Sequence, residues 1–183
     1  MTRSLADALN AVALCAVAFV LLAAFAGQVW LGELPCPLCM LQRVLFGLLA
    51  VGPMLNLRYG PRPSHYGLSL LAAVVGAVVS GRQILLHILP GDAGYGSPLF
   101  GRHFYTWAFV AFAGAIVAVA AVLQIDGQFE GPDARRSKPG LFASSAAWLV
   151  IGLTALNVAS ALLECGFGPC DDNPLVYRLL QPR

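Results

Sequence analysis

The sequence predicts an all-α integral membrane protein, and two features of its 183 residues lead to that prediction. Hydrophobic residues make up 58% of the chain, whereas charged residues make up only 11%, against a usual share of about 25%. A soluble domain of this size could not cover its surface with so few charges. The composition therefore excludes an ordinary soluble enzyme and a disordered chain. A net charge of +2 is also too small for a nucleic-acid-binding protein.

A helix needs about 20 mainly apolar residues to cross a bilayer, and five stretches of the chain reach that length. The first, fourth and fifth are free of charge, while the second contains Arg43 and the third contains Arg82. Barrel strands are excluded because none of the stretches alternates between polar and apolar residues. In chain order, we expect transmembrane helices near residues 8–29, 38–57, 66–88, 104–124 and 141–163.

The first span has one alternative interpretation. Residues Ala24-Phe25-Ala26, followed by Gly27, resemble a signal-peptidase site after a short basic start. The apolar run is long for a signal peptide, however, and continues to Trp30. We therefore expect this span to remain as a helix.

The positions of Lys and Arg in the short loops predict the orientation of the chain. One side of the membrane holds six of these residues: Arg3, Arg58, Arg62, Arg135, Arg136 and Lys138. The other side holds three: Arg102, Arg178 and Arg183. The richer side should be the cytoplasm, so five spans place the N-terminus inside and the C-terminus in the periplasm. Residues 126–140 are then a cytoplasmic loop, and residues 164–183 a periplasmic tail.

Four of the five cysteines form two close pairs, and Cys15 is best interpreted as a small apolar residue inside the first span. The pairs are Cys36-Pro-Leu-Cys39 and Cys165-Gly-Phe-Gly-Pro-Cys170. The expected topology places both at the outer face of the membrane. In a bacterium this compartment is oxidising, which favours disulfide chemistry over free thiols.

The first pair has the features of a reactive site. Pro35 and Pro37 place it at the start of the second span, where the helix dipole stabilises a thiolate. Arg43 follows Cys39 by four residues and so lies on the same helix face. Its guanidinium could stabilise the thiolate or a reduced aromatic ligand, although snorkelling toward the lipid headgroups is an alternative.

Cys36-Pro-Leu-Cys39-Met-Leu-Gln-Arg43 at the start of a second span resembles the disulfide bond formation protein B family, DsbB. The segment from Gly81 to Pro90, GRQILLHILP, is similar to the end of that family's third span. The similarity covers roughly residues 8–125. It implies a four-helix bundle of the inner membrane over residues 1–125, which passes electrons from a DsbA-like periplasmic protein through two cysteine pairs to a membrane quinone.

By this resemblance, Cys39 reacts with quinone, either ubiquinone or menaquinone, and Cys36 exchanges disulfides. Arg43 is the quinone-contacting arginine, and Arg82 and His87 are further candidates at the same pocket, although snorkelling explains them equally well. The chain departs from the family in one respect. The family carries its second cysteine pair between spans three and four, whereas residues 90–103 here contain no cysteine.

The extra fifth span leads directly to Cys165 and Cys170, which are therefore expected to form the second catalytic disulfide. A static bridge that holds the tail is the alternative. For the whole protein, we expect a membrane thiol:quinone oxidoreductase in contact with lipid and without nucleic acid. The open alternatives are a quinol-fed disulfide reductase and a metal-binding protein that uses the external cysteines.

Overall fold

The computed structural model describes residues 3–129 and 140–181, and the regular elements of this part of the chain are helices. The long ones are α1 (Arg3–Leu31), α2 (Pro37–Leu49), α3 (Val51–Tyr59), α4 (Pro63–Leu86), α5 (Phe104–Leu123) and α6 (Leu141–Cys165). Two short 3-10 helices are η1 (Asp126–Gln128) and η3 (Arg178–Leu180). Most of the expected cytoplasmic loop, 126–140, lies outside the described residues.

Five helical segments among the described residues are long and apolar enough to span a membrane, with α2 and α3 together forming the second of them. This confirms the expected all-α membrane fold. Each observed span lies within a few residues of the expected one. The largest difference is at α1, which begins at Arg3 because its first polar turn continues the helix outside the apolar run.

The second span is broken at Ala50 into α2 and α3 for a local reason. Pro53 has no backbone N–H, so the carbonyl of Leu49 lacks the donor that a regular helix would supply. The hydroxyl of Ser69 on α4 donates a hydrogen bond to this carbonyl at 2.8 Å. A neighbouring helix thus satisfies the backbone group that the proline leaves free, as bilayers require.

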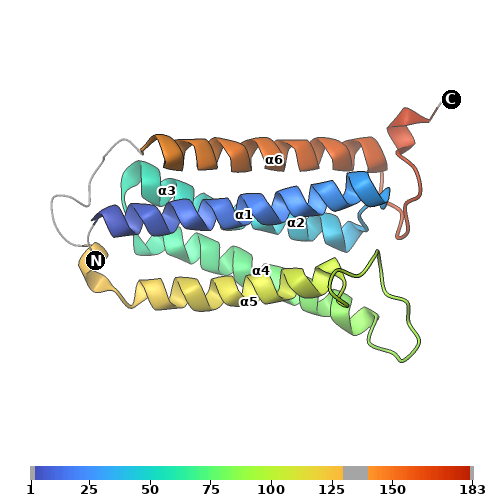
Figure 1. Cartoon of the computed structure of the whole chain (residues 1–183), viewed down its shortest axis with the longest axis horizontal. Coiled ribbons are helices and arrows are strands. Elements are labelled where there is room, and N and C mark those ends of the chain that lie inside the picture. The colour runs from blue at the N-terminus through green and yellow to red at the C-terminus, as the bar shows by residue number, and fades with distance from the viewer. Residues whose placement is uncertain (1–2, 130–139, 182–183) are drawn as a thin grey trace.

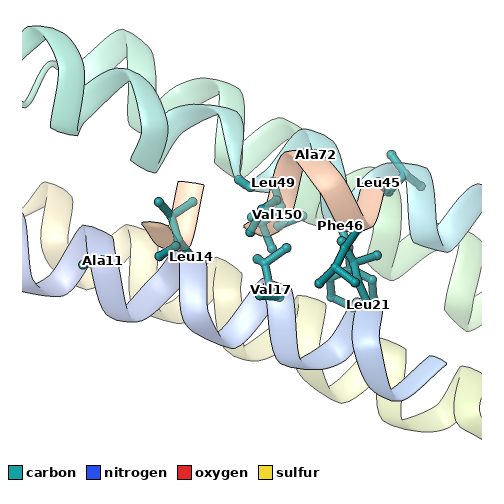
Figure 2. Packing of buried hydrophobic residues seen from close by; sticks show 14 of the residues in the cluster. Ala11, Leu14, Val17, Leu21, Leu45, Phe46, Leu49, Ala72 and Val150 are labelled. Atoms are coloured by element: carbon teal, nitrogen blue, oxygen red, sulfur yellow. The ribbon is translucent and has the colours of Figure 1, made fainter. Parts of the chain in front are cut away.

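The core is apolar and is contributed by all the long helices. Figure 2 shows Val17 and Leu21 of α1 beside Phe46 of α2 and Val150 of α6. The ring of Phe46 stacks on Phe112 of α5 with centroids 4.0 Å apart. This packing holds α2 in a fixed position against α1, α5 and α6.

Three irregular segments lie at one end of the bundle (Figure 1): the linker between α1 and α2, the loop between α4 and α5, and the C-terminal tail after α6. The loop is fastened to the linker by hydrogen bonds. Tyr95 donates to the carbonyl of Leu34, and the amide and hydroxyl of Ser97 donate to the Glu33 carboxylate at 2.8 and 2.6 Å. The linker that leads into the first cysteine pair is therefore covered on one side.

Candidate functional site

Cys36 is the N-cap residue of α2, and Pro37 follows it at the first helical position. The fixed φ of proline suits this position, where the missing N–H costs no hydrogen bond. The backbone N–H of Cys39 donates to the Cys36 sulfur at 3.3 Å. The sequence Cys-Pro-Leu-Cys thus folds so that both sulfurs lie at the positive end of the helix.

The two sulfurs lie close enough for disulfide formation without movement of the backbone. Their Sγ atoms are 2.6 Å apart, only about 0.6 Å more than a disulfide bond. The pKa of the Cys36 thiol is raised, first by its hydrogen bond with Cys39 and next by burial. In the reduced pair Cys36 therefore keeps its proton.

Gln83 of α4 contacts both sulfurs. Its side-chain amide nitrogen lies 3.2 Å from the Cys36 sulfur and 3.4 Å from the Cys39 sulfur. Gln42 donates to the Gln83 side-chain carbonyl at 2.8 Å, which fixes the orientation of the amide. Gln83 is 1% exposed, so this contact is shielded from solvent and lipid.

Arg43 lies one turn below Cys39 and is held by three acceptors. Its guanidinium donates to the side-chain oxygen of Gln28 at 2.6 Å, to that of Asn157 at 3.0 Å and to the carbonyl of Ala24 at 3.0 Å. These partners belong to α1 and α6. Arg43 is thus anchored between helices, which differs from an arginine that extends freely toward headgroups.

A cavity of about 400 Å³ opens beside the first cysteine pair. Cys39, Gln42, Arg43 and Phe46 form its α2 wall, and other walls come from α1, α5 and the loop between α4 and α5. Its lining is mainly apolar and includes Phe104, Tyr105 and Trp107. Two further lining residues, Phe19 and Val110, are exposed on the outside of the bundle. The cavity therefore reaches the surface that faces lipid.

Arg82 and His87 lie in different surroundings. Arg82 is exposed and is not part of the cavity wall, because its neighbour Gln83 occupies the inward position of that helical turn. His87 stacks on Tyr105, which lines the cavity, with ring centroids 5.7 Å apart. His87 also bonds to Asp92, whose pKa is lowered by the amide of Gly94 and by this histidine. The roles expected of Arg82 and His87 stay predictions.

The second cysteine pair forms a disulfide in the structure, between Cys165 at the end of α6 and Cys170 in the tail. Both of its sulfurs contact the sulfur of Met40, at 3.8 and 3.9 Å. A smaller cavity of about 300 Å³ separates this disulfide from Arg43, and Met40 lines it. A metal site with four external thiolates would require this disulfide to open.

Sequence reasoning missed four polar residues of the site: Gln28, Gln42, Gln83 and Asn157. All four are buried amides within expected spans. Polar side chains inside a membrane span are costly and therefore indicate function. That signal was present in the sequence, but only the fold shows that these amides surround Arg43 and the two sulfurs.

The first half of the chain is similar to known proteins. The sequence model described as "Disulfide bond formation protein DsbB" matches residues 6–96. "Disulfide bond formation protein B" of Xanthomonas axonopodis pv. citri is 35% identical over 111 residues, which are 57% of this chain and 64% of that protein. The protein of the same name from Chromobacterium violaceum is 46% identical over 83 residues, 42% of this chain and 46% of that protein.

The matched part of the chain thus spans less than two thirds of the length of these relatives. No solved structure matches the chain. The residues matched by the family model include Cys36, Cys39, Arg43 and Gln83, whereas α6 and the tail disulfide lie beyond them.

Proposed function

Because this chain belongs to the DsbB family, we propose that it is a thiol:quinone oxidoreductase of the bacterial inner membrane. It takes two electrons from a DsbA-like periplasmic dithiol protein and transfers them to a membrane quinone, which leaves a disulfide in the partner. The N-terminus lies in the cytoplasm and the end of the bundle that carries both cysteine pairs faces the periplasm.

The observation that carries the proposal is the position of Cys39 and Arg43 in the wall of one apolar cavity that reaches lipid. Its volume of about 400 Å³ falls within the usual range for small-molecule sites. Aromatic side chains suit a quinone ring, and the opening toward lipid suits an isoprenoid tail. Cys39, Arg43 and the rings of Phe104 and Tyr105 would hold the quinone ring.

A bound quinone supplies an acceptor for two electrons and two protons. Cys39 presents its sulfur to the cavity, and Gln83 orients that sulfur through its amide. Arg43 provides positive charge where negative charge develops during electron transfer. Its three fixed hydrogen bonds keep the guanidinium in place, so little reorganisation is needed at that moment.

Electrons from the partner reach Cys36–Cys39 through the tail disulfide. Cys165 and Cys170 lie at the periplasmic end of the bundle, and both of their sulfurs contact Met40, the residue after Cys39. The glycines between the tail cysteines allow the loop to move during exchange. The tail pair thereby replaces the pair that the family carries between its third and fourth spans.

The test uses protein purified in detergent and reconstituted with lipid. Its organic extract should contain quinone, and the protein should reduce added ubiquinone when reduced DsbA is supplied. Cys39→Ser should abolish this reduction, while Cys15→Ser, which removes a thiol that does not line the cavity, should leave it unchanged. Turnover that persists in Cys39→Ser would show that another group reacts with quinone.

A further inference from the structure

Glu164 is a buried acid that the proposed function does not use. Its side chain is 2% exposed, and within the described residues neither carboxylate oxygen has a hydrogen-bond partner. Burying an ionisable group that has no hydrogen-bond partner costs free energy. Such a group inside a membrane span indicates a function that needs it.

Its place in the fold relates Glu164 to both cysteine pairs. It directly precedes Cys165 in the last turn of α6, and the Cys165 sulfur contacts Met40, the residue after Cys39. Helical spacing also places Glu164 one turn above Ser160 and two turns above Asn157. Ser160 accepts a hydrogen bond from Gln28, and Asn157 accepts one from Arg43.

The charged and titratable groups around Glu164 come from three elements. Arg43 and Cys39 of α2 interact electrostatically with its carboxylate. Tyr95, in the loop between α4 and α5, also interacts electrostatically with it. From the tail, Tyr177 acts on Arg43. From α1 comes the neutral side-chain amide of Gln28, which accepts a hydrogen bond from Arg43. Glu164 is therefore next to a tail cysteine in the chain and interacts electrostatically with the residues of the first cysteine site.

We propose that the carboxylate of Glu164 accepts the proton of a tail cysteine thiol as that thiol attacks the Cys36–Cys39 disulfide. This inference rests on the proposed function and adds the path of one proton to it. A thiol must become a thiolate to attack a disulfide. In a buried position that conversion needs a nearby acceptor, and Glu164 is the neighbour of Cys165 in the chain.

The exchange balances in electrons and protons. After the partner has reduced Cys165–Cys170, one tail thiol gives its proton to Glu164 and its sulfur bonds to Cys36. The Cys36–Cys39 bond breaks, and Cys39 leaves as a thiolate. The second tail sulfur then displaces Cys36, which restores Cys165–Cys170 and takes the second proton to Cys36. Oxidation of Cys36–Cys39 by quinone finally removes two electrons, with one proton from Cys36 and one from Glu164.

The experiment compares two electron donors in the full-length protein reconstituted with ubiquinone. Reduced DsbA requires the tail pair, whereas dithiothreitol can reduce Cys36–Cys39 directly. In Glu164→Gln, the DsbA-driven rate should fall about 100-fold or more, the usual scale of a lost proton acceptor. The rise of this rate from acidic to neutral pH should also disappear. The dithiothreitol-driven rate should stay within about twofold, because that path bypasses the tail thiol.

Asp172→Asn is the matched control, because it removes a carboxylate that is exposed and lies two residues beyond Cys170. In Asp172→Asn, the DsbA-driven and dithiothreitol-driven rates and their pH profiles should equal those of the wild type. Glu164→Asp keeps a carboxylate and should restore the rise with pH. A wild-type pH profile in Glu164→Gln, or an equal loss with both donors, would overturn the proton-accepting role.

Infrared spectroscopy gives a second readout that does not depend on a stable variant. In the spectrum of the reduced protein minus that of the oxidised protein, both free of quinone, the C=O band of a protonated carboxyl group should appear. If the wild type lacks this band, the inference is wrong. The proposed function fails by a separate result, which is wild-type protein that reduces no quinone with either donor.

Discussion

The Sδ atom of Met40 lies 3.8 Å from the Sγ atom of Cys165. Met40 is also the residue after Cys39, so a single side chain of α2 connects the two cysteine pairs. The tail disulfide thus packs against α2 near the start of that helix. The proposed relay between the pairs depends on this arrangement.

The double variant Cys165→Ser/Cys170→Ser tests the relay. We expect loss of DsbA oxidation, because the tail no longer accepts electrons from the partner. Dithiothreitol should still reduce quinone through Cys36–Cys39, since that pair and its cavity are unchanged. Stopped-flow measurement of quinone absorbance with each donor distinguishes the two paths. Unchanged oxidation of DsbA would identify Cys165–Cys170 as a static bridge.

Arg43→Ala should weaken the use of quinone without unfolding the bundle. Hydrogen bonds to charged groups contribute about 1.5–3 kcal/mol, so kcat/KM for ubiquinone should fall about 10- to 100-fold. Arg43→Lys should recover only part of this loss, because lysine lacks the planar fork. One terminal nitrogen of that fork reaches Gln28 and Asn157, and the other reaches the carbonyl of Ala24.

Arg58→Ala is the control for that experiment, since Arg58 is exposed in the last turn of α3 and away from the cavity wall. Its kinetics should equal those of the wild type. Equal activity of Arg43→Ala and wild type at limiting ubiquinone would mean that Arg43 contributes no stabilisation to electron transfer.

Gln83→Leu should make the Cys36–Cys39 disulfide harder to reduce. The amide of Gln83 donates to both sulfurs, and such bonds stabilise the thiolate of the reduced pair. Loss of a net 0.5–1.5 kcal/mol, a typical range for one hydrogen bond, lowers the reduction potential by about 10–30 mV. A glutathione redox titration of the pair measures this shift.

Ser80→Ala serves as the matched control for Gln83→Leu. Ser80 is buried on the same face of α4, and its hydroxyl donates to the carbonyl of Gly76 within its own helix. The reduction potential of the Cys36–Cys39 pair in Ser80→Ala should equal that of the wild type. A potential in Gln83→Leu equal to that of Ser80→Ala would show that the amide does not stabilise the reduced sulfurs.

Gly52→Ala should destabilise the contact between α3 and α4. A Cβ atom at this position would collide with the hydroxyl of Ser69 and with the backbone carbonyl of His65. Overpacking of this kind costs about 1–3 kcal/mol, so the protein should unfold at lower denaturant concentration in micelles. Gly114→Ala, where a Cβ meets open space, should show little change in stability.

Local patterns in the sequence determined the helices. Apolar runs of bilayer length predicted five spans near their observed positions, because a membrane requires each span to satisfy its own backbone. The prolines around Cys36 likewise indicated the start of α2, since proline favours the first helical position and disfavours later ones. The spacing of Cys39 and Arg43 placed both on one face for the same local reason.

The tertiary structure alone decided which distant residues meet. Periodicity assigns a residue to a helix face but does not say which neighbour that face contacts. Packing of α4 turned Gln83 toward the sulfurs and left Arg82 exposed. Packing of α6 on α1 and α2 brought Asn157 to Arg43 and the tail disulfide to Met40. For the same reason Glu164 became a buried acid without a hydrogen-bond partner among the described residues, because only contacts between helices determine which polar groups are enclosed.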